Sequence, residues 1–225
     1  MTAVDFQLKR LLPTRELTNL AVADAEAERI RVELDWKLAA FGAFFSESLD
    51  QVVLVRLGDY AKKSTTWSLP GGGVEPDEQP SKAIARELEE EAGIGIEDGL
   101  RLAAWLPRPW FRPWNRPDKP GELILLFAGI ANHNAPLRPN PPETLAADFV
   151  PFTLDRLLAA ADLSEAEHPQ GGIRKHWCYW ARLGQRALQR QLDPPVVWSY
   201  ENREAMAQPP WKQLTTTESP TAITS

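Results

Sequence analysis

One short stretch of the chain, residues 72–94, limits most strongly what the sequence can fold into. It contains seven acidic and two basic residues, which leaves a net charge of −5 within 23 residues. Such a concentration of negative charge is unfavourable unless a cation offsets it. One glycine opens the stretch and Gly93 lies near its end. The stretch therefore predicts a divalent-metal site built on one short helix.

The segment from Pro80 to Ala92 has the pattern of an α-helix. Proline is accommodated in a first helical turn, where its missing N–H is not needed, and Gly93 is a typical C-terminal stop. Apolar side chains recur at i, i+4 and i+8, at Ile84, Leu88 and Ala92. This stripe is expected to lie on a core.

Three glutamates of this segment, Glu87, Glu90 and Glu91, lie three or four positions apart and therefore share a helix face. Like charges at that spacing destabilise a bare helix, whereas a hard cation with oxygen ligands reverses the effect. Glu78, in the preceding loop, can turn back toward this face, and Arg86 can orient a carboxylate. The alternative is a solvated acidic face without chemical meaning.

The spacing of the whole stretch resembles the Nudix box. Its fixed positions are filled by Gly72, Glu78, Arg86-Glu87-Leu88, Glu90-Glu91 and Gly93-Ile94. The lead-in over residues 67–72 also resembles the family's approach to the box. The resemblance is specific at the box and only architectural elsewhere.

The resemblance implies a Nudix-type α/β/α sandwich with a mixed sheet over residues 34–192. Residues 1–33 are expected to form a helical N-terminal extension, with the helix over 16–33, and residues 193–225 a largely disordered C-terminal extension. Apolar and alternating segments predict strands at 36–46, 51–57, 67–69, 100–106, 122–130 and 148–152. Further helices are expected at 154–162 and 174–191.

Composition and charge exclude several classes of protein. The net charge of −6 and the pI near 5.2 argue against general nucleic-acid or lipid-surface binding. The sequence has no apolar run of about 18 residues and no signal-peptide pattern. A single cysteine, Cys178, cannot form an internal disulfide, and the three histidines lack zinc-ligand spacing. We therefore expect a cytoplasmic protein that binds neither nucleic acid nor membrane.

The resemblance also implies an activity, the hydrolysis of a nucleoside diphosphate linked to another moiety. The implied cofactor is Mg²⁺, for which Mn²⁺ can substitute, because a divalent ion neutralises phosphate oxygens and lowers the pKa of the attacking water. By the family pattern, Glu90 and Glu91 are the principal metal ligands and Glu87 a further ligand, with the Gly72 backbone near the metal. A nucleotide-binding or regulatory module that does not hydrolyse is the alternative, although such modules usually have eroded boxes.

The general base remains open in the sequence. Crowded carboxylates raise one another's pKa while a metal ion lowers it, so that any of the box glutamates can be tuned. In several Nudix subfamilies a glutamate outside the box takes this role, and Glu143 lies at about the expected place. Its alternative is an ordinary exposed loop residue. Glu78 is implied as a structural carboxylate and Arg86 as its ion-pair partner in the catalytic set.

A basic aromatic loop at residues 105–121 is the candidate for substrate recognition. Trp110, Phe111 or Trp114 can stack on a base, while Arg108 and Arg112 can pair with phosphate. The alternative is a proline-stiffened loop that packs on the domain or on the second subunit of a homodimer. The sequence does not choose among ADP-ribose or other nucleotide sugars, dinucleoside polyphosphates and oxidised nucleoside triphosphates.

Overall fold

The structure is a computed structural model that describes residues 14–58, 66–109, 113, 115–191 and 195–197. Four of the residues predicted to bind substrate, Trp110, Phe111, Arg112 and Trp114, lie outside the described residues. The same is true of most of the C-terminal extension for which disorder was expected. Within the described ranges, no helix has the length and apolar character needed to cross a membrane.

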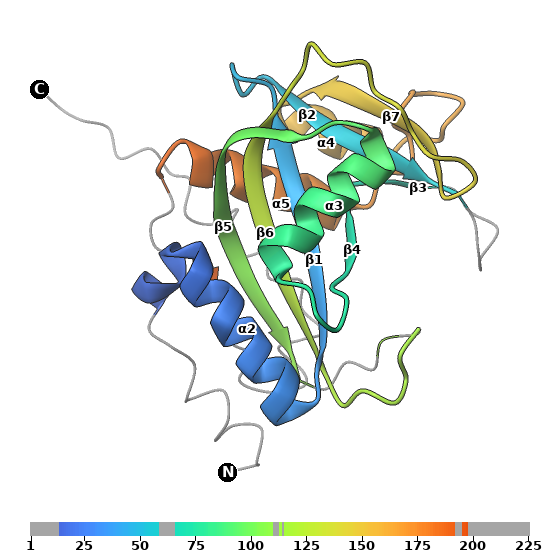
Figure 1. The fold of residues 1–225 in the computed structure, drawn as a ribbon. Helices are drawn as coiled ribbons and strands as arrows, with labels where there is room; N and C mark the ends of the chain where they lie inside the picture. Colours follow the sequence, from blue (N-terminus) through green and yellow to red (C-terminus); the bar gives the residue numbers. More distant parts are fainter. Residues whose placement is uncertain (1–13, 59–65, 110–112, 114, 192–194, 198–225) are drawn as a thin grey trace, which may run out of the picture.

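A mixed sheet forms the centre of the described part of the molecule (Figure 1). Its strands are β1 (Lys37–Phe45), β2 (Gln51–Leu57), β3 (Thr66–Ser68), β4 (Gly71–Gly73), β5 (Ile96–Arg108), β6 (Glu122–Ala131), β7 (Thr144–Pro151) and β8 (Val196–Val197). The order is β3-β2-β1-β6-β5-β8, and β4 pairs with β1 while β7 pairs with β2. The β1–β6 pair is parallel, whereas β1–β2, β1–β4 and β5–β6 are antiparallel.

Helices cover both faces of this sheet (Figure 1). They are the 3₁₀ helix η1 (Thr14–Thr18), α2 (Leu20–Leu34), α3 (Pro80–Ala92), α4 (Leu154–Ala161) and α5 (Lys175–Leu188). Side chains of α2 and α3 join one apolar cluster, and those of α4 and α5 join the other. The predicted three-layer α/β/α architecture is therefore confirmed.

Strand β1 explains how the two clusters share one sheet. Ala39 and Ala43 belong to the cluster beneath α4 and α5, whereas Leu38, Ala40 and Phe44 belong to the cluster beneath α2 and α3. Successive side chains of a strand point to opposite faces, so a strand covered on both sides is apolar throughout. This is why the segment has no polar alternation in the sequence.

The structure differs from the sequence-based expectation at several boundaries. Strand β4 was not predicted, because glycine has low strand propensity, but its backbone pairs with β1 at Ala40–Gly72. Strands β5 and β7 begin four residues earlier than predicted, since pairing with β6 and β2 extends them. Strand β8 was not predicted, and α5 is shorter than expected.

The predicted N-terminal helix is present but begins later, at Leu20, after the short η1. It packs on the domain: Ala23, Ala27 and Ile30 are 0–1% exposed and join the same apolar cluster as the buried stripe of α3. The extension is thus continuous with the core on the α3 side of the sheet. The predicted domain boundaries themselves remain predictions.

Candidate active site

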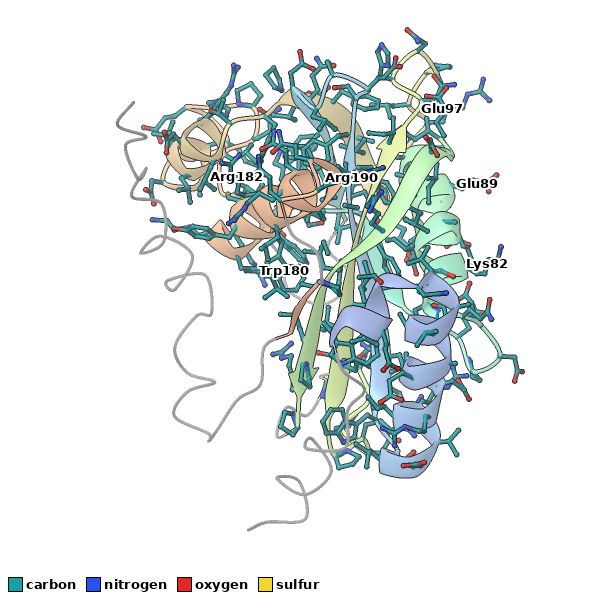
Figure 2. The ribbon with its side chains drawn as sticks, turned by 90° about the vertical axis from the view of Figure 1, so that its left-hand side faces the viewer. Lys82, Glu89, Glu97, Trp180, Arg182 and Arg190 are labelled. Carbon is teal, nitrogen blue, oxygen red and sulfur yellow. The ribbon has the colours of Figure 1, made fainter. Side chains whose placement is uncertain are left out.

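Helix α3 places the acidic residues against the edge of β4. The helix spans Pro80–Ala92 and is capped by Gly93, whose φ of 70° suits glycine. The predicted stripe of Ile84, Leu88 and Ala92 is fully buried, so the helix is fixed on the sheet by its apolar side. Glu89 projects away from the sheet on the outer side of the helix (Figure 2).

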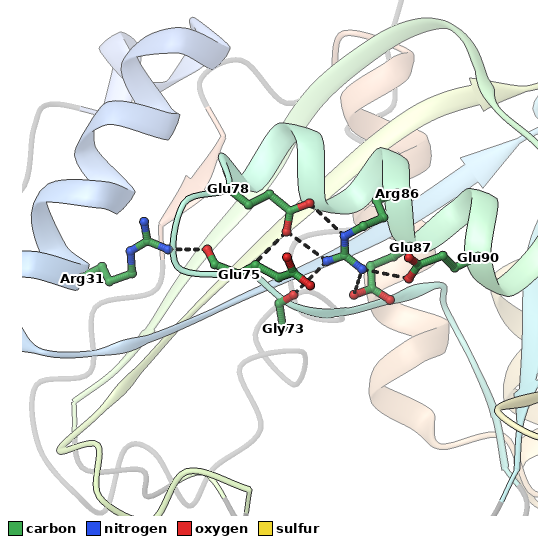
Figure 3. A network of polar contacts seen from close by, with 7 residues as sticks. All are labelled: Arg31, Gly73, Glu75, Glu78, Arg86, Glu87 and Glu90. Atoms are coloured by element: carbon green, nitrogen blue, oxygen red, sulfur yellow. Dashed lines mark hydrogen bonds and ion pairs between the residues drawn. The ribbon is translucent and has the colours of Figure 1, made fainter.

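Arg86 is the centre of a network of polar contacts (Figure 3). Its Nε and Nη2 donate to the two carboxylate oxygens of Glu78, each at 2.9 Å, in a bidentate pair. Its Nη1 donates to Glu87 at 3.0 Å and to Glu90 at 2.8 Å, and Nη2 reaches the carbonyl of Gly73 at 3.2 Å. The predicted Glu78–Arg86 ion pair is therefore present.

The two charges of that pair stabilise each other. The hydrogen bonds from Arg86 lower the pKa of the Glu78 carboxyl, and the Glu78 carboxylate raises the pKa of the guanidinium further above its ordinary value. Glu78 is thus held as a fixed anion and Arg86 as a fixed cation between the acidic residues of the helix.

Glu91 is the most buried acid of the box. Only 6% of the residue is exposed, and the Gly71 N–H donates to its Oε2 at 2.9 Å. Burial raises the pKa of this carboxyl to about 8, and the neighbouring charges of Glu87, Glu143 and Glu90 add to the effect, while the Gly71 hydrogen bond opposes it. A buried carboxylate beside other acids lacks the positive charge that would favour its ionised form.

Glu87 lies beside the backbone of Gly72. A Cβ atom at Gly72 would stand 2.7 Å from Glu87 Oε1, so only glycine fits there with this carboxylate in place. Burial raises the pKa of Glu87, and the adjacent Arg86 cation partly offsets this. The expectation that a side chain at position 72 would intrude on the site agrees with this geometry.

Glu143 approaches the box from a distant part of the chain. It is exposed in the loop before β7, and its carbonyl accepts a hydrogen bond from Gly58 N–H at 2.7 Å. Its charge contributes to raising the pKa of both Glu87 and Glu91. The fold therefore brings the candidate base within electrostatic reach of the box carboxylates.

The donor atoms suit a hard divalent cation in type, since carboxylate and carbonyl oxygens are the preferred ligands of Mg²⁺. Among the described residues, however, no three His, Cys, Asp or Glu side chains are arranged as a ready set of metal ligands. Glu87 and Glu90 face Arg86, and Glu91 faces Gly71 N–H. The buried Glu91 fits a metal ion nearby, and so does the glycine at position 72, which has no side chain to displace the Glu87 carboxylate. The assignment of Glu87, Glu90, Glu91 and Gly72 to the metal ion remains a prediction.

On the predicted substrate side, Arg108 ends β5 and donates to Glu122 at 2.9 Å. Glu122 is 5% exposed and also pairs with Lys37 at 3.4 Å, which means that Arg108 is partly neutralised. Trp105, from the same loop prediction, is fully buried and belongs to the core. The substrate role of Arg108 remains a prediction.

Sequence reasoning gave little weight to an aromatic cluster at the start of α5. His176 and Trp177 are half-buried, and the ring of Trp177 lies 5.0 Å from those of Phe41 and Trp180. Burial lowers the pKa of His176 to about 4, with a further contribution from the charges of Arg174 and Arg108. Trp180 is buried in the apolar cluster beneath α4 and α5, on the face of the sheet opposite α3 (Figure 2).

Comparisons with known proteins agree with the motif. The NUDIX domain model matches residues 36–173, which is more than half of the chain. Diphosphoinositol polyphosphate phosphohydrolase 2 of Rattus norvegicus is 50% identical over 58 residues, or 26% of this chain and 31% of that protein. The human 3-alpha form is 47% identical over 69 residues, or 31% and 40%. The matches thus span less than half the length of these relatives.

Solved structures of similar proteins were also found. An ADP-ribose pyrophosphatase from Streptococcus suis is 26% identical, with a TM-score of 0.47, and the match covers 72% of this chain and 98% of that one. The NUDIX domain of Shewanella oneidensis NrtR, complexed with ADP ribose, is 14% identical with a TM-score of 0.49, over 85% of this chain and 100% of that one.

Proposed function

The chain belongs to the Nudix family, and from that premise we propose that it hydrolyses a phosphoanhydride bond with Mg²⁺ as its cofactor. The proposed substrate is a nucleoside diphosphate linked to another moiety. The observation that supports this most strongly is Glu91, a buried carboxyl whose pKa is raised to about 8 among three further acids. Such an arrangement is expected of a site tuned to work with a cation.

The residues that would hold Mg²⁺ are Glu87, Glu90 and Glu91, together with the backbone of Gly72. When bound, the ion supplies charge neutralisation at the phosphate oxygens and a water of lowered pKa. Glu90 is half exposed and paired with Arg86, so it can turn toward solvent without breaking the core. Mn²⁺ is expected to substitute, since it accepts the same oxygen ligands.

The remaining residues of the site have two roles. Arg86 and Glu78 position the metal-binding carboxylates, and Glu143 accepts a proton. Arg86 holds Glu87 and Glu90 on one side of the helix, and its bidentate pair with Glu78 fixes the guanidinium in place. Glu143 is the proposed general base, accepting the proton of the attacking water. Its exposed position before β7 gives it access to solvent and substrate.

Diphosphoinositol polyphosphates form a second candidate substrate class. The relatives that are 47–50% identical in the aligned segment are named for hydrolysing them. These compounds share the phosphoanhydride bond with nucleoside diphosphate derivatives, although they lack a nucleobase. Recognition of the group beyond the phosphates therefore distinguishes the two classes.

One substrate screen tests the proposal. The full chain is incubated with Mg²⁺ or Mn²⁺ and ADP-ribose, a nucleotide sugar, a dinucleoside polyphosphate or a diphosphoinositol polyphosphate, and the products are separated by chromatography. We expect cleavage of a nucleoside diphosphate derivative and none with EDTA. Preferred cleavage of the inositol compound would favour the second class. Tight nucleotide binding without cleavage of any compound would indicate a non-hydrolysing module and overturn the proposal.

Replacing Glu143 by glutamine tests the proposed base. Loss of a general base typically reduces kcat by about 10²–10⁴-fold, and we expect KM to change by less than about threefold because the group acts on water. Steady-state kinetics at saturating Mg²⁺ measure both constants. Glu97→Gln, which removes an exposed glutamate at the start of β5, is the matched control. If Glu143→Gln retains the wild-type kcat, the base is one of the box glutamates.

A further inference from the structure

Helix α2 contacts the box although it precedes the matched family region, which begins at residue 36. Besides its apolar packing, it makes two polar contacts with the segment around the start of α3. Asp24 binds Ser81, which is 57 positions away in sequence, and Arg31 binds the backbone of Glu75. The first contact is to the first turn of the acidic helix, and the second is to the loop that leads into it.

Asp24 acts as a helix cap supplied from another element. The residue at the N-cap position of α3, Gln79, makes no side-chain capping bond, and the first turn of α3 contains no acidic residue. Asp24 Oδ1 instead accepts the Ser81 N–H at 3.0 Å, and its Oδ2 accepts the Ser81 hydroxyl. An anion at this position satisfies an otherwise unpaired N–H and complements the helix dipole.

Arg31 starts a chain of contacts that ends at the box carboxylates (Figure 3). Its Nη1 donates to the carbonyl of Glu75, and the Glu75 N–H donates to Glu78 Oε2 at 3.1 Å. Glu78 in turn holds Arg86 through two hydrogen bonds of 2.9 Å. Arg86 is the residue that orients Glu87 and Glu90, so each link depends on the placement of the one before it.

We propose that Asp24 and Arg31 are positioning residues for the reaction, which hold the 74–79 loop and the start of α3 so that Arg86 presents the metal-binding carboxylates. This inference rests on the proposed function. It adds two residues of the N-terminal helix to those that support the proposed metal site. A purely structural role for α2 would depend on its buried apolar residues, Ala23, Ala27 and Ile30. The polar contacts would then be dispensable for metal binding and turnover.

The test compares charge-removing variants of the full chain at a temperature where circular dichroism shows all of them folded. Mn²⁺ affinity is measured by calorimetry without substrate, and kcat and KM are measured with Mg²⁺. Loss of residues that orient metal ligands typically weakens metal affinity or activity by about 10–100-fold. We expect Arg31→Gln and Asp24→Ala to lie near the lower end of that range in both Mn²⁺ affinity and kcat, with KM changed less than about threefold.

Two matched variants separate positioning from stability. Glu28 forms an ion pair with Arg31 and does not belong to the chain of contacts in Figure 3. Glu28→Gln is therefore expected to leave Mn²⁺ affinity and kcat within about twofold of wild type. Asp24→Asn retains an oxygen acceptor for the Ser81 N–H and is expected to restore most of the affinity and kcat that Asp24→Ala loses. If Asp24→Ala does not fold, Arg31→Gln decides the matter: wild-type Mn²⁺ affinity and kcat in that variant overturn the positioning role.

Wild-type Mn²⁺ affinity and kcat in both Arg31→Gln and Asp24→Ala would overturn the positioning role. A wild-type chain that binds Mn²⁺ but cleaves no compound contradicts the proposed function alone, and the metal affinities of the variants still decide the role of α2. A wild-type chain that binds no Mn²⁺ contradicts both proposals.

Discussion

Glu91→Gln is expected to reduce kcat/KM for the phosphoanhydride substrate by at least about a thousandfold, which corresponds to a loss of about 4 kcal/mol of transition-state stabilisation. The substitution removes the charge needed to hold a divalent ion but keeps an oxygen that can accept the Gly71 N–H. Because Glu91 is 6% exposed, the similar size of glutamine preserves the packing around it. The measurement is steady-state kinetics over a range of Mg²⁺ concentrations.

The control for this variant is Glu89→Gln, on the same helix. Glu89 is exposed and points away from the sheet, so its loss changes the helix charge by the same amount without touching the site (Figure 2). We expect its kcat/KM to stay within about twofold of wild type. Full activity of Glu91→Gln, or an equal loss in both variants, would contradict the assignment of Glu91 as a metal ligand.

The acidic helix was predictable from the sequence because its signals are local. A proline in the first turn, a glycine after the last turn and an apolar stripe at helical spacing set the bounds Pro80–Ala92, and the structure has the same bounds. The Glu78–Arg86 pair was also predicted, on the family pattern. The strands at 36–46, 51–57 and 122–130 were also predictable from a local signal. They are covered on both faces of the sheet, so their sequences are mostly apolar.

The features that sequence reasoning missed depend on long-range pairing. Three consecutive glycines, Gly71–Gly73, form a strand only because β1 offers its backbone groups. The cap that Asp24 provides to α3 joins residues 57 positions apart, and no periodic pattern in the sequence predicts such a contact. The sharing of Arg86 between Glu87 and Glu90 likewise depends on side-chain geometry beyond what i, i+4 spacing specifies.

The contribution of Glu91 to the stability of the metal-free protein is expected to fall as pH rises. Its folded-state pKa of about 8 exceeds the ordinary value of 4.5, so the folded chain binds this proton more tightly than the unfolded chain does. The stabilisation from the proton is complete below about pH 4.5 and is lost as pH rises toward 8. The slope is at most about 1.4 kcal/mol per pH unit, or roughly 3 kcal/mol between pH 5.5 and 8.

Urea denaturation in EDTA at several pH values measures this effect, and Glu91→Gln isolates it because glutamine does not titrate. We expect the free energy of unfolding of the wild type to decline more steeply than that of Glu91→Gln, so that the inactive variant is the more stable protein at pH 8. Adding Mg²⁺ should stabilise the wild type at pH 8 by mass action and leave Glu91→Gln nearly unchanged. Parallel pH profiles for the two proteins in EDTA would show that Glu91 is ionised in the folded metal-free state, contrary to the effect of its burial.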